Sequence, residues 1–197
     1  MEATCLRAGF STIHEKDTTR KNAEFIAVHK KTGQHVAVEA KSKHRDGVMG
    51  RPGSRQADPD MRFGKLINNA IQKDPNNPLA IFVDTNLPPE RADRFYAPVS
   101  REPVTLSKPI SRYIDEIRAT NGGVDPYNLL VFTNHPQHYS EHDRRTPDDH
   151  WAAFISDKPR VTVFAESALR DLLNALDLYR NVPTDFPNLI PGTNIPE

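Results

Sequence analysis

The stretch AEFIAVHKKTGQHVAVEAK, residues 23–41, decides how the chain begins to fold. Two apolar-rich arms flank a polar segment, KTGQ, whose glycine suits a tight turn. This pattern predicts two antiparallel strands, over residues 24–28 and 35–41. Successive side chains of a strand point to opposite faces, so Glu39 and Lys41 should share one face of the second strand.

The turn geometry decides which polar residues meet on that face. A two-residue turn at Thr32 and Gly33 would place Glu24 opposite Lys41, with Glu39 on the diagonal. A three-residue loop with a glycine bulge would shift the register by one residue and would need local twist to bring Glu24 round. The group is then either an exposed ion pair, which contributes little stability, or a catalytic group on a rigid strand.

The remainder of the chain alternates helical and strand-like patterns. A short helix ended by Gly9 precedes a first strand, FSTI. Helical patterns lie over residues 61–73, 110–120 and 167–181. Strand-like runs lie over residues 79–84, 127–134 and 160–165; the first two are typical of buried strands and the last of an edge strand. This order predicts an α/β fold with a mixed β-sheet of four to six strands flanked by helices.

Composition narrows the class of protein. The 197 residues carry no net charge, so no global field attracts the chain to a polyanion, and any such site must be a local patch. The single cysteine, Cys5, excludes an internal disulfide framework and favours a reducing, cytoplasmic setting. No apolar run approaches the roughly 20 residues that span a bilayer, and no signal-peptide pattern opens the chain, so we expect no membrane partner.

Two short motifs in the hairpin resemble those of a known superfamily. An acidic residue with a following phenylalanine, Glu24-Phe25, precedes the tripeptide Glu39-Ala40-Lys41 across the turn. This arrangement resembles the PD-(D/E)xK nucleases, which have the restriction-endonuclease-like fold, and CLRAGF resembles their step from first helix to first strand. The likeness is good over residues 2–45, loose to about residue 135 and architectural beyond.

The resemblance implies a metal-dependent nuclease that hydrolyses phosphodiester bonds in DNA or RNA, with DNA the expected partner. Glu24, Glu39 and Lys41 would be its catalytic residues. Glu24 stands where the family usually has aspartate, and Glu2 would match the glutamate of the first helix. Glu24, Glu39 and Glu2 would hold Mg²⁺ or Mn²⁺, since carboxylates suit hard divalent cations. Lys41 would position the attacking water or stabilise charge on phosphorus.

A basic loop follows the E-x-K tripeptide in the sequence. Residues 43–60 show no periodicity and contain many turn-forming residues, which predicts a loop. Its candidate nucleic-acid-binding residues, which would contact backbone phosphates without reading sequence, are Lys43, Arg45, Arg51 and Arg55. The alternative is an ordinary solvated loop, and the two interpretations have nearly equal weight.

Other polar groups carry weaker signals. The histidine-rich segment 135–150 matches no zinc-ligand spacing and is interpreted as a polar surface loop. Gln72 and Lys73 lie where the nuclease superfamily often has a supporting polar residue, although an exposed helix end is the favoured interpretation. Asp84 ends a buried strand and is interpreted as a turn cap.

A single domain over residues 1–197 is expected, with a nuclease-like core over about 2–135, a strand and helix over 158–181 and a polar tail over 182–197. Three hypotheses follow for its function. The first is an active nuclease, which the resemblance would also allow to act as a homodimer. The second is a catalytically inactive module of the same fold that binds nucleic acid or another partner. The third is an unrelated α/β protein whose E-x-K is a surface pair.

Overall fold

A computed structural model describes residues 1–14, 22–42, 63–73, 76–84, 107–134 and 150–178. Six strands form one sheet in the order β1 to β6: Phe10–Ile13, Phe25–His29, His35–Ser42, Leu79–Asp84, Leu129–Asn134 and His150–Ile155. The helices of the described part are α1 (Glu2–Arg7), α2 (Phe63–Ile71), α4 (Ser107–Thr120) and α5 (Glu166–Leu178). The expected α/β class with a mixed sheet and flanking helices is confirmed.

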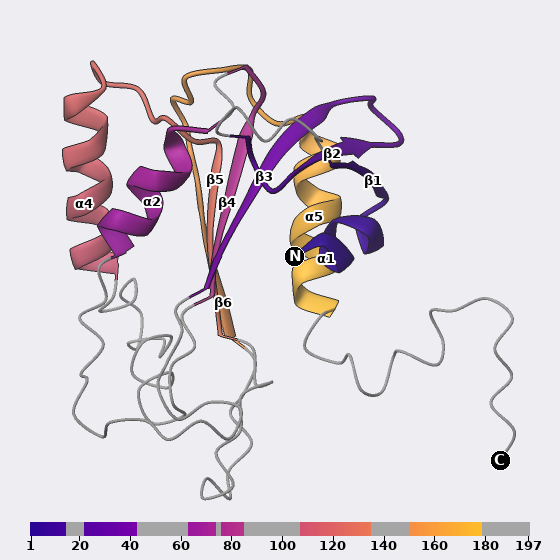
Figure 1. Cartoon of the computed structure of the whole chain (residues 1–197). Helices are drawn as coiled ribbons and strands as arrows, with labels where there is room; N and C mark the ends of the chain where they lie inside the picture. Colours follow the sequence, from indigo (N-terminus) through magenta and orange to yellow (C-terminus); the bar gives the residue numbers. More distant parts are fainter. Residues whose placement is uncertain (15–21, 43–62, 74–75, 85–106, 135–149, 179–197) are drawn as a thin grey trace, which may run out of the picture.

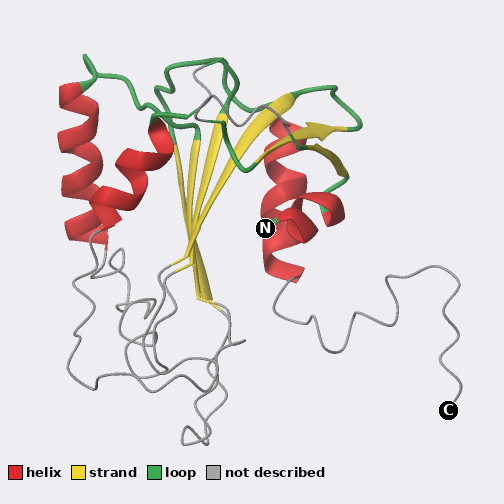
Figure 2. Ribbon diagram, viewed as in Figure 1, coloured by secondary structure: helices red, strands yellow, loops and turns green. Residues whose placement is uncertain are grey.

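The elements form three layers. Figure 1 shows the sheet nearly edge-on, with α2 and α4 on one side and α1 and α5 on the other, and Figure 2 shows the same layers by type. Strands β3, β4 and β5 run parallel to one another. The pairs β1–β2, β2–β3 and β5–β6 are antiparallel. The parallel strands are covered on both faces, which explains why LAIFVD and LLVFTN are continuous apolar runs. As expected, both are interior strands.

The core has two parts, one on each face of the sheet. Side chains of α2 and α4, including Ile67 and Ile114, pack on the face that carries Ala37. Side chains of α5, including Leu172, pack with α1 on the face that carries Val38. Alternation along β3 therefore assigns Glu39 and Lys41 to the face covered by α2 and α4.

The hairpin turn differs from both turns expected from the sequence. Five residues, 30–34, connect β2 to β3, and the amide of Gly33, whose φ is 70°, donates to the carbonyl of His29 at 2.7 Å. Phe25 pairs with Val38, so continuing the register places Glu24 beside Glu39 rather than beside Lys41. The register has slipped by two residues relative to the two-residue turn, and an even slip leaves every side chain on its expected face.

The predicted edge strand over residues 160–165 is wrong. The edge strand of the sheet is β6, which pairs antiparallel with β5. The backbone carbonyls of the 160–165 segment bind side chains instead: Thr162 accepts from Nδ2 of Asn128 at 2.8 Å, and Val163 accepts from Nε2 of Gln34 at 2.9 Å. Sequence patterning favoured the β-branched run, whereas the alanine-rich HWAAFI has the weaker strand propensity.

The other expected elements agree with the structure within a few residues. The first helix ends before Gly9, whose φ of 82° suits glycine at this boundary, and FSTI forms β1. Among the described residues, no helix is long and apolar enough to cross a bilayer.

Candidate functional site

The hairpin and α2 bring four charged side chains together. Glu39 and Lys41 come from β3, Glu24 directly precedes β2, and Lys73 follows the end of α2. The ammonium of Lys41 contacts Oε1 of Glu39 and lies 3.9 Å from Oε1 of Glu24. Nζ of Lys73 lies 2.9 Å from the same Glu39 oxygen. We call these four residues the Glu39 cluster.

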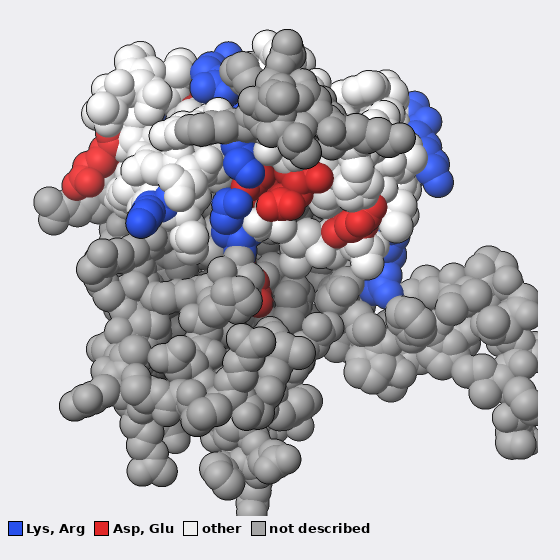
Figure 3. Space-filling view, viewed as in Figure 1, with Lys and Arg blue, Asp and Glu red and all other residues white. Residues whose placement is uncertain are grey.

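The cluster lies at the surface, although its central residue is buried. The side chain of Glu39 is 0% exposed, whereas Lys41, Lys73 and Glu24 are 21%, 23% and 50% exposed. Figure 3 shows acidic side chains gathered near the centre of one face of the molecule, with basic side chains directly beside them. The acid is thus buried, while its charged neighbours remain partly accessible to water.

The carboxylate of Glu39 is not fully satisfied by protein groups. Within the described part of the chain, neither of its oxygens accepts a hydrogen bond of ordinary geometry; Oε1 faces the two ammonium groups and Oε2 has no hydrogen-bond partner. An unsatisfied buried oxygen of a charged group costs upward of about 1–3 kcal/mol. A carboxylate oxygen without a hydrogen-bond partner is free to act as a ligand of a hard divalent cation.

Glu2, the third candidate ligand, takes part in a different group. Its carboxylate accepts from Oγ1 of Thr12 at 2.7 Å and lies 2.9 Å from Nε2 of His14. The hydrogen bond from Thr12, followed by that of His14, lowers the pKa of Glu2. Thr12 lies two residues after Phe10 in β1 and therefore shares its face, which is the one covered by α1 and α5, so the structure does not bring Glu2 to Glu39.

A metal ion at the Glu39 cluster could draw on only two carboxylates of the described residues. Across these residues, no three His, Cys, Asp or Glu side chains gather closely enough to hold an ion. Mg²⁺ is commonly bound by one or two carboxylates, with water and substrate phosphate oxygens completing its shell. Glu39 and Glu24, which share contact with Lys41, fit such a partial set, and the unsatisfied Oε2 of Glu39 is the atom that favours it.

Lys73 is the residue that sequence interpretation undervalued. The favoured interpretation, an exposed helix end, is wrong for Lys73, whose side chain is 23% exposed and pairs with Glu39, whereas Gln72 is exposed as expected. The amide of Lys73 donates to the carbonyl of Ala70 at 3.0 Å, which extends the last turn of α2 toward β3. The sequence did carry a signal for this contact, because a lysine directly after an amphipathic helix can form an ion pair with a neighbouring strand.

Several predicted residues lie outside the described residues. These are the four basic candidates Lys43, Arg45, Arg51 and Arg55, and residues 135–149 of the histidine-rich segment. Their predicted roles stay predictions. Asp84 is described: it ends β4, and its Oδ1 lies 3.5 Å from Oγ1 of Thr133 at the end of β5.

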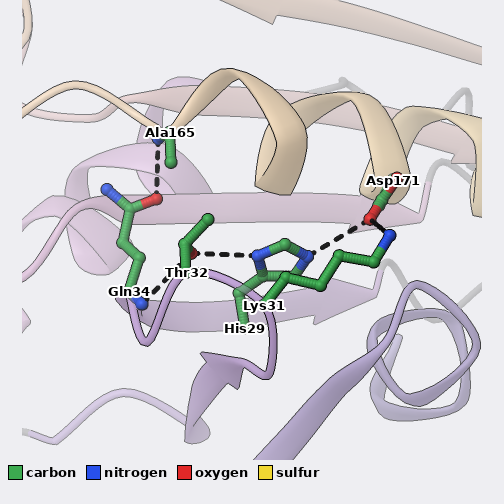
Figure 4. Close-up of polar contacts among 6 residues, drawn as sticks. All are labelled: His29, Lys31, Thr32, Gln34, Ala165 and Asp171. Carbon is green, nitrogen blue, oxygen red and sulfur yellow. Dashed lines mark hydrogen bonds and ion pairs between the residues drawn. The ribbon is translucent and has the colours of Figure 1, made fainter.

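A second polar group connects the hairpin turn to α5 on the opposite face of the sheet (Figure 4). Nδ1 of His29 lies 2.9 Å from Oγ1 of Thr32, and its Nε2 lies 3.3 Å from Oδ2 of Asp171. Lys31 donates to the same Asp171 oxygen at 2.7 Å. The side chain of Gln34 accepts from the amide of Ala165, one residue before α5 begins, at 2.8 Å.

This second group is best explained as a structural brace. Hydroxyl, imidazole and carboxylate stand in line, as in a nucleophile relay. The imidazole of His29, however, is 0% exposed and packs against the ring of Phe10 with centroids 4.8 Å apart. The hydroxyl of Thr32 also accepts from the amide of Gln34 at 3.3 Å, as turn hydroxyls commonly do. These contacts hold the turn of the hairpin, whose second strand, β3, carries Glu39.

Comparison with family models, with curated proteins and with solved structures finds no match for this chain. The candidate site is therefore argued from its own geometry.

Proposed function

We propose that this chain is a metal-dependent nuclease with a restriction-endonuclease-like fold, acting on DNA or RNA. The observation that carries the proposal is the buried carboxylate of Glu39, which has an oxygen with no hydrogen-bond partner among the described residues and a lysine two residues along the same strand. The order of elements also supports the proposal. A helix, three strands paired antiparallel, a second helix and a parallel strand follow one another, which is the order expected of the superfamily that the E-x-K motif resembles.

Each residue of the Glu39 cluster has a role in this proposal. Glu39 and Glu24 would hold the divalent cation, which supplies charge neutralisation and a more acidic water. Lys41 lies beside both carboxylates, where its ammonium can orient the attacking water and stabilise negative charge that develops on the phosphoryl oxygens. Hydrolysis then forms a bond from the water oxygen to phosphorus and breaks the ester bond to the leaving alkoxide. The attacking water loses its proton to solvent, and a solvent water protonates the alkoxide, so that the products are a phosphate monoester and an alcohol.

The test compares metal binding with cleavage. Purified wild type is assayed by calorimetry with Mg²⁺ and Mn²⁺, and by nicking of plasmid DNA and cleavage of RNA. We expect Glu39→Gln to abolish both binding and cleavage. Lys41→Ala should retain metal binding but reduce the rate by about 10²-fold or more, as is typical for loss of an electrostatic stabiliser. Glu166→Gln, an exposed acid at the start of α5, is the matched control.

Two outcomes would contradict the nuclease proposal. Cleavage that survives Glu39→Gln, with circular dichroism like that of wild type, would remove the catalytic assignment. Absence of both cleavage and metal-binding heat in the wild type would favour the inactive binding module. One observation supports that second hypothesis: Lys41 and Lys73 already pair with Glu24 and Glu39, so the two acids and two lysines of the cluster balance without a cation.

A further inference from the structure

Two ammonium groups compete for one oxygen of Glu39. Lys41 and Lys73 both contact Oε1, although they reach it from different elements. Lys41 has a second acidic neighbour in Glu24, 3.9 Å away. Among the described residues, Lys73 has no acidic partner other than Glu39. The two lysines therefore differ in how much each loses when Glu39 takes another partner.

A divalent cation at Glu39 would oppose both ammonium groups. Like charges within a few ångströms repel strongly in a partly buried site, so the weaker-held ammonium should leave. Lys41 projects from β3, an interior strand of the sheet, and has Glu24 as a second acidic neighbour. Lys73 lies beyond the last helical residue of α2, is 23% exposed and has a flexible four-carbon side chain, so it can turn toward water.

We propose that Lys73 is the resident counter-ion of Glu39, which a divalent cation must displace, and that displacement frees its ammonium to bind a phosphate oxygen of the substrate. This inference rests on the proposed function and adds a regulatory step to the same site. The cation and the phosphate then bind cooperatively, because each favours the state in which Lys73 has left Glu39. In the metal-free protein, the same ion pair reduces the cost of the buried carboxylate.

The first test is the affinity for Mn²⁺ alone, measured by calorimetry. Lys73→Gln removes the competitor and should tighten Mn²⁺ binding about tenfold, whereas Lys73→Arg, which retains the charge, should stay close to wild type. Lys65→Gln is the matched control: this lysine lies on α2 and is exposed, so its loss changes the net charge equally without touching the cluster. Thermal melts check that all variants fold.

The second test reports directly on the side chain. The rate of acetylation by a succinimidyl ester is measured for each lysine by mass spectrometry, with and without Mn²⁺. The rate at Lys73 should rise on addition of the cation, while that at Lys65 stays constant.

The outcomes separate the two proposals. Mn²⁺ binding that depends on Glu39 but is equal or weaker in Lys73→Gln, or an unchanged acetylation rate at Lys73, would overturn the displacement and leave the metal site standing. No Mn²⁺ binding by the wild type would overturn both.

Discussion

Removing the carboxylate of Asp171 should lower the free energy of unfolding by an amount that follows from the contacts of the hairpin brace. The imidazole of His29 is 0% exposed, and its Nε2 lies 3.3 Å from Oδ2 of Asp171. Because a carboxylate only accepts, Nε2 is assigned as the donor. Asp171→Ala leaves this buried donor without a partner, which costs about 1–3 kcal/mol of unfolding free energy. For a chain of this size, each kcal/mol corresponds to roughly 2–4 °C in Tm.

Two variants separate the buried hydrogen bond from the exposed ion pair on the same carboxylate. Asp171→Asn keeps an acceptor oxygen for His29 and should cost less than Asp171→Ala. Lys31→Ala removes only the outer partner, whose side chain is 71% exposed, so we expect about 0–1 kcal/mol. Equilibrium urea unfolding at pH 7, with equal m-values across the series, measures these differences. Equal losses for Asp171→Ala and Lys31→Ala would refute the argument.

The same brace predicts a dependence on pH. The hydrogen bond from Lys31, followed by that of His29, lowers the pKa of Asp171 in the folded protein. A depressed folded pKa gives stability that is present above the unfolded value, near 4, and is lost as the pH falls through the folded value. The difference in unfolding free energy between wild type and Asp171→Asn should therefore shrink below about pH 4.

Three further predictions concern other parts of the fold. Burial raises the pKa of Asp125, but hydrogen bonds from Arg118 and Ser156 outweigh it, so the pKa is lowered. Asp125→Asn should therefore reduce the free energy of unfolding, measured in urea, by about 3 kcal/mol at pH 7 and by less in acid. Burial raises the pKa of the Cys5 thiol to about 12, so a thiol reagent at pH 8 should label it only in denaturant. Tyr113→Phe removes a 2.7 Å hydrogen bond to the carbonyl of Gly64 and should lower the unfolding free energy by about 1 kcal/mol.

Much of the sheet was predictable because its signals are local. A continuous apolar run such as LAIFVD must be covered on both faces, and it forms an interior strand. The last strand was missed because HWAAFI has two alanines and a polar start, and its pairing with β5 is set by tertiary packing. Residues 160–165 show the converse, since their β-branched side chains favour a strand while Asn128 and Gln34 bind their carbonyls.

The candidate site was predictable as far as side-chain alternation reaches. Glu39 and Lys41 share a face in any register, and an even slip of the hairpin left Glu24 beside them. The contact with Lys73 depends on where α2 ends relative to β3, which no pattern within the hairpin encodes. The placement of Glu2 failed for a related reason: its partners, Thr12 and His14, lie on the opposite face of the sheet.

The burial of Glu39 is the strongest physical argument that the E-x-K motif has a function. Strand β4 places Ile81 directly beside Glu39, and an apolar residue at position 39 would continue the core that Ala37 and Ile81 form with α2. Replacing a buried ion pair with apolar side chains of similar volume is often neutral or stabilising by 1–4 kcal/mol. Stability alone therefore gives little reason for a buried acid that contacts two lysines and has one oxygen unsatisfied by the part of the chain that the structure describes. A site that breaks the rules of core packing while its surroundings obey them is where function is expected.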